Sequence, residues 1–572
     1  MDVDAVRAWI AEDPDPETAR ELTELLATAT AAPGPDSPDG DAVVSATAEL
    51  EDRFSGPLAF GTAGLRGALG GGPNRMNRAV VLRTAAGLAA FLAERLDGQP
   101  ARVVIGYDAR HGSAQFARDT AAVVTAAGGK AMLLPSTLPT PVLAFAVRHL
   151  DADAGVMVTA SHNPPADNGY KVYLGGRVVT GSGRGAQIVP PYDAEIAAHI
   201  AAVGPLSEVR VADGGWDVLT NGILEDYLTR VASLVPAGHA RSLKIVLTPM
   251  HGVGGATTVE ALRRAGFTDV HVVPEQAQPD PDFPTVAFPN PEEPGALDLS
   301  FELARHVRAD LVIANDPDAD RCSVAVPDHA AAGGWRQLTG DEVGTLLGEQ
   351  AAVAAAMVDG GVLANSIVSS RLLAKVAVSH GLEHRTTLTG FKWISRVEGL
   401  VFGYEEALGY CVDPGAVRDK DGISAAVRTA FLASQLADRG LTLRDELDRL
   451  AVRHGVHATA PLSVRVADLS LIGAAMTRLR SAGPTHLAGS PMAQVADLSQ
   501  GYEGLPPTDG LLYLSEAGDR VIIRPSGTEP KLKCYLEVIE PVADADALGA
   551  ARERAAERLS RIRTEIATAV GL

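Results

Sequence analysis

Cysteine is scarce in this chain: only Cys322, Cys411 and Cys534 occur among 572 residues, and no two of them have C-x-x-C spacing. Three thiols in a chain of this length cannot form a disulfide framework. We therefore expect a reducing compartment, the cytoplasm, as the location of the protein.

Positive charge is also in short supply, because 50 Lys and Arg residues face 71 Asp and Glu residues, a net charge of −21. Nucleic acids and anionic membranes bind positive surfaces, so neither is expected as a partner. The first residues, "MDVDAVRAWIAEDPDPE", are acidic where a signal peptide would be basic, and no apolar run has membrane-spanning length. We expect a small-molecule ligand and a monomer or dimer.

The length exceeds what one hydrophobic core supports, so we expect three to five domains. Apolar residues in residues 1–30 recur at helical spacing, and "AAPGPDSPDG" at 31–40 has the composition of a linker. A unit of strand, turn, helix and strand then occurs three times, beginning at "RVVIGYDARHGS", "LKIVLTPMHGVGG" and "GVLANSIVSS". Strands joined through helices indicate α/β sheets covered by helices.

The last part of the chain has a different pattern, with alternating strands such as "DRVIIRPS" and "KLKCYLEVIE" before a closing helix. The sequence thus predicts three related α/β domains and a C-terminal α+β domain. The predicted boundaries are a helical extension and linker at 1–40, α/β domains at 41–235, 236–340 and 341–457, and the α+β domain at 458–572.

Ser161 and His162 stand together in "TASHNPPADNGYK", directly after the apolar strand "AGVMVTA". Ligands of open α/β domains gather at the carboxyl ends of strands, which places the Ser161 hydroxyl well for chemistry. An ordinary turn would also use Ser, Asn, Pro and Gly. The G-x-S-x-G pattern of the α/β-hydrolases is absent here.

Three aspartates, Asp316, Asp318 and Asp320, alternate in "ADLVIANDPDADRC" after another apolar strand. Crowded carboxylates repel one another, and a hard divalent cation makes such crowding tolerable. A calcium EF-hand is excluded, since its sixth and twelfth positions would be Arg321 and Pro327. We predict a Mg²⁺ site in preference to an Asp-rich surface turn, because three carboxylates leave coordination positions for a phosphate oxygen.

Two further loops carry polar groups. Adjacent glutamates, Glu405 and Glu406, lie in "GYEEALGY" and could accept hydrogen bonds from the hydroxyls of a polyol, although a solvated turn explains them almost as well. Arg524 ends a strand before "PSGTEPK", where a guanidinium, loop amides and hydroxyls could cradle a phosphate, with an ordinary hairpin turn as the alternative.

The few cations are concentrated in glycine-rich or turn-rich loops, as expected of a net-acidic protein that binds a small dianion. They are Arg66, Lys171, Arg321, Lys392, Lys420, Arg524, Lys531 and Lys533.

In their order along the chain, these motifs resemble those of the α-D-phosphohexomutase family, which contains phosphoglucomutases and phosphomannomutases. The resemblance extends from about residue 50 to residue 540, and it implies that the four domains surround a central cleft. It rests on "FGTAGLRG", "TASHNPPADNGYK", "DPDADR", "TGFKWI", "GYEEALGY", "DKDG" and "RPSGTEPK". The pair "GYEEALGY" and "TGFKWI" is most similar to the branch with phosphopentomutase-like phosphoglucomutases.

The resemblance implies a role for each matching residue. Ser161 would be the phosphorylated serine, and Asp316, Asp318 and Asp320 would hold Mg²⁺ together with the serine phosphate. Arg66, His162, Lys171 and Arg321 would surround the transferring phosphoryl group, with His162, Lys171 and Lys420 as candidates for proton transfer. Substrate contacts would come from Thr62, Thr389, Lys392, Glu405, Glu406, Lys420, Arg524, Ser526, Gly527, Thr528 and Lys531.

The implied activity is that of an isomerase, an intramolecular phosphotransferase of phosphoglucomutase type. Glucose 1-phosphate and glucose 6-phosphate would interconvert through a 1,6-bisphosphate, which would also activate the enzyme. One departure concerns Ala407, which stands where glucose-specific members commonly have a serine, so one sugar contact is in question. Mannose and ribose phosphates are alternative substrates. A Mg²⁺-dependent phosphatase would use the same aspartates, and a non-catalytic sensor would lack the serine or an aspartate.

Overall fold

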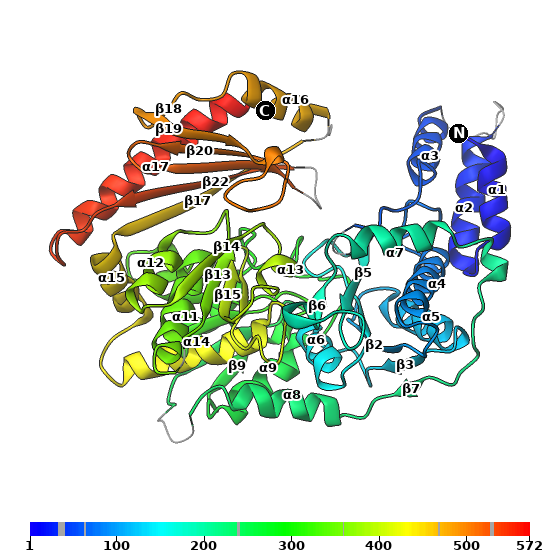
Figure 1. Ribbon diagram of the computed structural model, residues 1–572, viewed down its shortest axis with the longest axis horizontal. Coiled ribbons are helices and arrows are strands. Elements are labelled where there is room, and N and C mark those ends of the chain that lie inside the picture. The colour runs from blue at the N-terminus through cyan, green and yellow to red at the C-terminus, as the bar shows by residue number, and fades with distance from the viewer. Residues whose placement is uncertain are drawn as a thin grey trace. The chain divides into compact units, whose positions relative to one another are not determined.

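The computed structural model (Figure 1) describes residues 1–31, 40–61, 64–236, 241–358, 360–466, 470–526 and 531–571. The chain forms two compact units. The first unit comprises Met1–Gln337 and Asp413–Val427, and the second comprises Leu338–Val412 and Arg428–Leu572. None of the helices in the described residues is both long and apolar enough to cross a membrane.

The first unit begins with three helices, α1 (Val3–Glu12), α2 (Pro16–Ala29) and α3 (Gly40–Arg53). The helical pattern expected over residues 1–30 is therefore present, but it is divided between α1 and α2. The Asp15 side chain accepts a hydrogen bond from the Glu17 amide and caps α2. The three helices share a small apolar cluster of Val6, Leu22, Leu26 and Leu50. Most of the expected linker, 32–39, lies outside the described residues.

A seven-stranded sheet forms the largest part of the first unit, in the order β1–β5–β4–β2–β3–β7 with β6 beside β5. β2, β3 and β4 pair in parallel, whereas β5 runs antiparallel between β4 and β1. The strands are β1 (Leu65–Ala68), β2 (Arg102–Tyr107), β3 (Lys130–Leu133), β4 (Ala154–Val158), β5 (Asp167–Leu174), β6 (Ala186–Gln187) and β7 (Asp217–Val218). The helices are α4 (Arg78–Arg95), α5 (Ser113–Ala126), α6 (Thr140–His149), α7 (Tyr192–Ala201) and α8 (Gly222–Ala232).

A five-stranded sheet completes the first unit, in the order β12–β11–β10–β8–β9. β10 pairs in parallel with β8, and every residue of both strands is buried, as a sheet covered on both faces requires. The elements are β8 (Ile245–Thr248), β9 (Val270–Val272), β10 (Leu311–Ala314), β11 (Ser323–Pro327), β12 (Trp335–Gln337), α9 (Gly254–Arg264) and α10 (Asp298–Val307).

The second unit contains a four-stranded sheet in the order β14–β13–β15–β16. Its strands are β13 (Val362–Ser366), β14 (Glu383–Thr387), β15 (Leu400–Glu405) and β16 (Gly409–Cys411). The helices of this part are α11 (Gly340–Ala355), α12 (Leu372–Ser379), α13 (Phe391–Ile394), α14 (Gly422–Ala437) and α15 (Leu443–His454). The first residues of α14 belong to the first unit.

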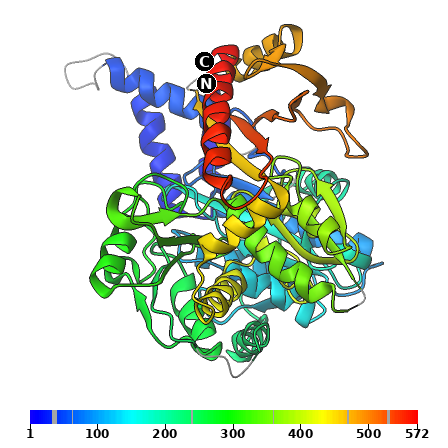
Figure 2. The same cartoon turned by 90° about the vertical axis from the view of Figure 1, so that its left-hand side faces the viewer.

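The C-terminal part of the second unit is a six-stranded antiparallel sheet, in the order β17–β22–β21–β20–β19–β18. α17 (Leu548–Val570) packs along one face of this sheet, as Figures 1 and 2 show. The other elements are β17 (Val456–Arg465), β18 (His486–Leu487), β19 (Ser490–Asp497), β20 (Leu511–Ser515), β21 (Arg520–Pro525), β22 (Lys531–Glu540) and α16 (Ser470–Ser481). Three α/β sheets and a distinct C-terminal domain confirm the predicted fold class.

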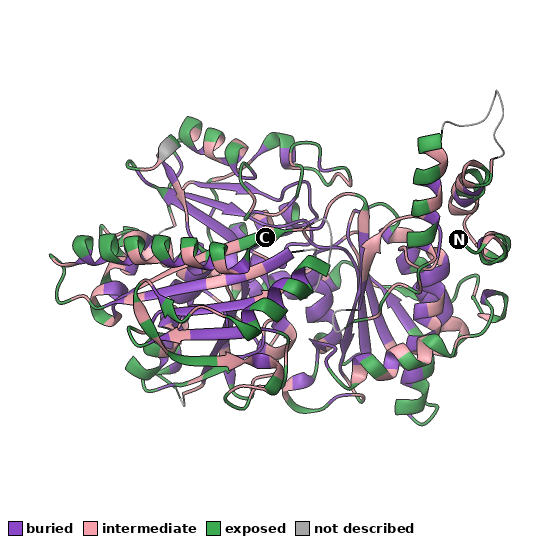
Figure 3. Cartoon of the chain, turned by 90° about the horizontal axis from the view of Figure 1, so that it is seen from above, coloured by how far each residue is buried: buried purple, intermediate pink, exposed green. Residues whose placement is uncertain are grey.

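Burial follows the layering that these elements predict. Figure 3 shows buried residues along the strands and exposed residues on the outer faces of the helices. In β21 the side chains alternate: Val521 and Ile523 join the core beneath α17, whereas Ile522 joins a cluster on the opposite face. Both faces of this strand are therefore covered within the second unit.

We predict that Ile562→Ala destabilises the C-terminal domain, because Ile562 is fully buried between α17 and the sheet. Loss of three side-chain carbons at such a site costs about 2–5 kcal/mol. Calorimetry on the full chain should show a lower unfolding temperature, whereas Val495→Ala, at a site 57% exposed, should leave it within a degree or two. Equal behaviour of the two variants would contradict this packing.

Candidate active site

Ser161 lies in the loop after β4 and is the centre of the polar network in the first unit. Its backbone φ is 52°, in the left-handed region, and its side chain is buried. The Ser161 hydroxyl donates a 2.7 Å hydrogen bond to Oδ2 of Asp316, and Nδ1 of His162 lies 3.3 Å from the same hydroxyl oxygen. The structure therefore brings the Ser161–His162 pair together with a carboxylate from a separate sequence motif.

Arg110 holds this loop in place, a role that the sequence analysis missed. Its guanidinium donates to the carbonyl oxygens of Ser161 and Asn163 at 2.6 Å each, to that of Pro164 at 2.7 Å and to that of Asp167 at 3.1 Å. The planar fork of arginine carries five N–H donors in fixed directions, against three on a lysine ammonium, and so suits a set of four carbonyl acceptors. The only sequence signal was an Asp-Ala-Arg turn after β2.

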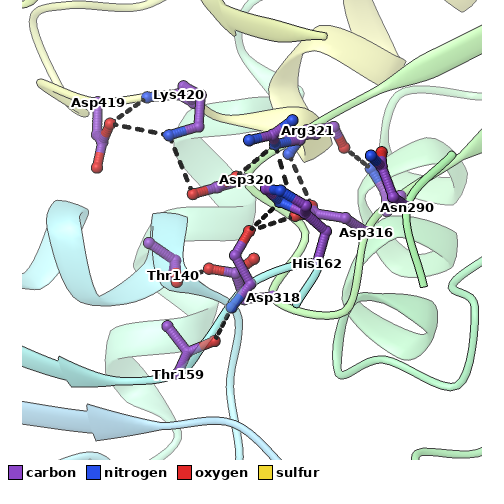
Figure 4. A network of polar contacts seen from close by, with 12 residues as sticks. Thr140, Thr159, His162, Asn290, Asp316, Asp318, Asp320, Arg321, Asp419 and Lys420 are labelled. Atoms are coloured by element: carbon purple, nitrogen blue, oxygen red, sulfur yellow. Dashed lines mark hydrogen bonds and ion pairs between the residues drawn. The ribbon is translucent and has the colours of Figure 1, made fainter. Parts of the chain in front are cut away.

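Asp316, Asp318 and Asp320 follow β10 and are all fully buried. Ligand oxygens from the three carboxylates lie within 4.8 Å of one another, and Figure 4 shows the side chains converging. Two unit charges at that separation repel by ~3.5 kcal/mol at an effective dielectric of about 20. Such crowding requires compensating positive charge.

Cationic side chains of the first unit supply part of that charge. Lys171 Nζ lies 2.7 Å from Asp318 and 2.9 Å from Asp320, and Lys420 Nζ lies 3.2 Å from Asp320. The Arg321 guanidinium is 3.9 Å from both Asp316 and Asp320. Figure 4 shows Arg321 and Lys420 directed at the aspartates from different sides.

The environment shifts the pKa values of Asp316 and Asp318 in opposite directions. Burial, together with the charges of Asp318 and Asp320, raises the pKa of Asp316 well above its ordinary value. Burial also acts to raise the pKa of Asp318, but the ammonium of Lys171 and hydrogen bonds from Lys171 and Thr140 lower it below its ordinary range. Thr140 donates to Asp318 Oδ2 at 2.6 Å and is a second residue that the sequence analysis missed.

The carboxylate oxygens of this cluster are suitable ligands for a hard cation. Oδ1 of Asp318 and Oδ1 of Asp320 are buried and accept no hydrogen bond from the described residues. Unsatisfied carboxylate oxygens are costly unless a cation binds them, and carboxylate oxygens are the ligands that Mg²⁺ prefers. The three aspartates therefore offer the kind of oxygen ligands that the predicted Mg²⁺ site needs.

Two glycines, one just before α9 and one at its first residue, lie in close contact with the metal loop, residues 315–321. A Cβ on Gly252 would lie 2.4 Å from the Cα of Pro317, and a Cβ on Gly254 would lie 2.5 Å from the Cβ of Ala319. The amide of Val253 donates to the Pro317 carbonyl at 2.8 Å. A side chain at position 252 would collide with the Pro317 backbone, and one at position 254 with the Ala319 side chain, so glycine fits best at both.

The segment 413–427 supports the metal loop from the sequence region expected to form the third α/β domain. Tyr173 and Gln187 donate to Oδ2 of Asp419 at 2.6 and 2.7 Å. Tyr227 donates to Asp421 at 2.9 Å. These buried contacts fix Lys420 beside Asp320 and explain why this segment belongs to the first unit.

Arg66, on β1, joins the same region by donating to the Asn163 side chain at 3.1 Å. Ser161, His162, Lys171, Arg321, Lys420 and the three aspartates are thus grouped with Arg66 in one unit. Thr62 lies outside the described residues.

The sugar and phosphate candidates lie in the second unit. Glu405 ends β15, and Glu406 follows it in the turn to β16. Thr389 directly precedes Gly390, whose φ is 106°, and Lys392 lies in the short helix α13 that follows. Arg524 lies on β21, and the Ser526 amide donates at 2.9 Å to the carbonyl oxygen of Lys531, the first residue of β22. Gly527 and Thr528 lie outside the described residues.

Domain models of the phosphoglucomutase/phosphomannomutase family match four successive parts of the chain. The alpha/beta/alpha domains I, II and III match residues 57–204, 225–331 and 339–452, and the C-terminal domain matches residues 463–555.

Individual proteins with different names are also similar. A "Probable phosphomannomutase" of Haemophilus influenzae is 48% identical over 81% of this chain and 93% of its own length. A human phosphopentomutase is 35% identical over 87% of each chain, and a Staphylococcus haemolyticus phosphoglucomutase is 34% identical over 85% of this chain and 91% of its own. A family member from Burkholderia thailandensis has the same fold, with a TM-score of 0.66 and 19% identity over 90% of this chain and 97% of its own.

We predict that Gly422→Ala weakens binding of Mn²⁺, a probe for Mg²⁺, by roughly 10–100-fold, as loss of support around metal ligands commonly does. A Cβ there would lie 2.1 Å from the Arg321 carbonyl oxygen and 2.8 Å from that of Ala319, so the metal loop must move. Isothermal titration calorimetry measures the affinity.

Gly415→Ala is the matched control, since its Cβ would have no neighbour closer than 3.4 Å in the same supporting segment. Identical Mn²⁺ affinities for both variants would show that the segment does not support a metal site.

Proposed function

The chain belongs to the phosphoglucomutase/phosphomannomutase family of phosphosugar mutases, and we propose that it interconverts glucose 1-phosphate and glucose 6-phosphate through a phosphoserine at Ser161. The observation that carries the proposal is the 2.7 Å contact between the Ser161 hydroxyl and Asp316, within the buried aspartate cluster. A nucleophilic hydroxyl beside three carboxylates requires a cation, and that combination suits phosphoryl transfer.

In the proposed cycle, phosphorylated Ser161 transfers its phosphoryl group to the free hydroxyl of a hexose monophosphate. The bond between phosphorus and the serine oxygen breaks, a bond to the sugar oxygen forms, and the sugar hydroxyl loses its proton. The resulting 1,6-bisphosphate turns round and returns its other phosphoryl group to Ser161. The phosphate has then migrated between C1 and C6, and the enzyme is restored.

Asp316, Asp318 and Asp320, with an oxygen of the serine phosphate, would hold Mg²⁺. The bound ion would supply charge neutralisation to the phosphoryl oxygens during transfer. Arg66, Arg321 and Lys171 would add positive charge around the same group, because a loose transition state requires alignment and charge neutralisation above all.

Proton transfer needs a group close to the reacting hydroxyl. His162 has its Nδ1 3.3 Å from Ser161 Oγ. Lys171 and Lys420 are paired with the aspartates, so both also serve to balance charge. These three residues are our candidates for the general acid and base.

Most of the proposed substrate contacts come from the second unit, and Thr62 and Lys420 would add to them. We propose that Glu405, Glu406, Thr389 and Lys392 bind the sugar. The phosphate that is not reacting would be held by Arg524, Ser526, Gly527, Thr528 and Lys531. A separate phosphate clamp favours a mutase over a Mg²⁺-dependent phosphatase, because a mutase must retain a bisphosphate and a phosphatase need not.

The choice of glucose is the finer part of the proposal. Ala407 removes a hydroxyl that could contact the sugar, and similar proteins bear the names of mannose, pentose and glucose phosphate mutases. Phosphomannomutase or phosphopentomutase activity on the same groups is therefore the alternative. We also propose a cytoplasmic location, and a monomer or dimer as the active form.

Ser161→Ala should abolish mutase activity, because no oxygen remains to carry the phosphoryl group, and should remove one phosphate from the intact mass of the purified protein. The assay is coupled formation of glucose 6-phosphate from glucose 1-phosphate, primed with glucose 1,6-bisphosphate. Ser207→Ala, an exposed serine in the same unit, is the control and should retain full activity. Release of inorganic phosphate at the turnover rate would instead indicate a phosphatase.

Comparison of kcat/KM for the 1-phosphates of glucose, mannose and ribose tests the substrate proposal. We expect glucose 1-phosphate to be preferred by tenfold or more, about 1.4 kcal/mol of transition-state binding. A higher value for mannose or ribose 1-phosphate would replace the proposed substrate without changing the proposed chemistry.

A further inference from the structure

The segment Ser366–Arg371, which runs from the last residue of β13 to the residue before α12, contacts both the sugar loop and the C-terminal sheet within the second unit. We call it the bridging segment. It contributes three serines, Ser366, Ser369 and Ser370, all of them buried. Buried hydroxyls need hydrogen-bond partners, and the partners of these serines lie in two different parts of the unit.

On one side the bridging segment binds the sugar loop, residues 403–411. Ser366 and Ser369 donate to the same oxygen, Oε2 of Glu406, at 3.0 and 2.8 Å, and the Glu406 amide donates to Ser369 Oγ at 3.3 Å. The adjacent Ser370 amide donates to Asp341 at 2.7 Å, and Tyr404 donates to the same Asp341 oxygen at 2.9 Å. Position and orientation of the sugar loop are thus tied to the bridging segment.

On the other side the bridging segment binds the C-terminal sheet. Arg520, at the start of β21, donates to the carbonyl oxygens of Ile367 at 2.8 Å and Ser369 at 2.6 Å. Glu537, directly opposite Arg520 on β22, accepts from Ser370 Oγ at 2.9 Å and from the Arg371 amide and Nε at 2.7 Å each.

Arg520 and Glu537 are themselves an ion pair, 3.0 Å apart and both buried. Burial acts to raise the pKa of Glu537, but Arg520 and Arg371 lower it to about 2, so the carboxylate stays charged. Removal of one partner of a buried pair leaves an uncompensated charge, so these contacts hold the segment firmly.

The face of β21 that meets the bridging segment also carries Arg524. Side chains at alternate positions share a face, so Arg520, Ile522 and Arg524 point the same way. Ile522 packs in one cluster with Ile367 and Val368, in agreement with this geometry. Arg520 and Arg524 lie about 13 Å apart along the strand, at 3.3 Å per residue.

We propose that the bridging segment fixes the distance between the sugar loop and Arg524, with Arg520, Glu537 and Ser369 as positioning residues that set which phosphosugar fits. This inference rests on the proposed function, since it needs a substrate whose sugar and distal phosphate are bound by these two elements. A pentose 5-phosphate is shorter than a hexose 6-phosphate by one carbon–carbon bond, ~1.5 Å. A shift of about 1 Å between binding groups can cost 100-fold in rate, so a rigid connection would discriminate between the two.

Hydrogen exchange of the full chain tests the connection without reference to activity. In Arg520→Lys the fork that binds two carbonyls and Glu537 is lost, so peptides covering 403–411 should exchange at least threefold faster than in the wild type. Arg558→Lys is the matched control, because Arg558 pairs with Asp519 and Glu540 of the same sheet without a contact to the bridging segment among the described residues. Unchanged exchange over 403–411 in Arg520→Lys would overturn the inference.

Kinetics test the positioning role. Arg520→Lys and Ser369→Ala should each raise KM for hexose 1-phosphate about tenfold and lower the hexose-to-pentose ratio of kcat/KM, with the Ser161 phosphate content unchanged. In the double variant the two effects should be less than additive, because both act through one segment. Unchanged KM and substrate ratio in variants that exchange faster would overturn the positioning role. Absence of mutase activity in the wild type would instead refute the proposed function, and hydrogen exchange would still decide whether the connection exists.

Discussion

The repulsion among three buried carboxylates is the constraint on which the rest of the first unit depends. Asp316, Asp318 and Asp320 could not be brought within 4.8 Å of one another, away from water, without positive charge nearby. Lys171, Lys420 and Arg321 supply it from three separate stretches of the chain. The aspartate cluster therefore requires cationic side chains around it. Because Ser161 donates a hydrogen bond to Asp316, the serine hydroxyl lies among the same charges.

The backbone around the cluster is shaped to hold that arrangement. Glycines 252 and 254 approach the metal loop from one side and Gly422 from another, each too closely to admit a side chain. Arg110 fixes the serine loop through four carbonyl oxygens. In the second unit, Arg520 and Glu537 fix the bridging segment in a comparable way. Buried polar contacts between loops, rather than the sheets alone, position the groups proposed to act on substrate.

The site residues that could be predicted from the sequence are those that lie in short local motifs. Alternate aspartates after an apolar strand and a serine at the end of another were recognised because each pattern lies within about ten residues. The family and the fold class are confirmed. The supporting residues were missed because their partners are distant: Thr140 binds Asp318, 178 residues away, and Tyr173 binds Asp419, 246 residues away.

The sequence also did not predict the packing of the 413–427 segment. This segment follows the third sheet in the chain but packs with the first two sheets. The local pattern of apolar residues cannot predict which unit this segment joins. That choice depends on buried hydrogen-bond partners from distant parts of the chain, such as Gln187 and Tyr227. The sugar loop is a similar case. Two adjacent glutamates look equivalent in the sequence, yet Glu406 is held by two serines whose proximity only the fold reveals.

The central claim is that Ser161 carries the phosphoryl group in transit. Its most direct test is to incubate the protein with glucose 1,6-bisphosphate labelled with ³²P, isolate the protein, and map the label by peptide analysis. We expect label on the peptide that contains Ser161, and transfer of that label to added unlabelled hexose monophosphate only when Mg²⁺ is present. Label on any other residue, or its release as inorganic phosphate with none in the sugar, would show that Ser161 does not carry the phosphoryl group.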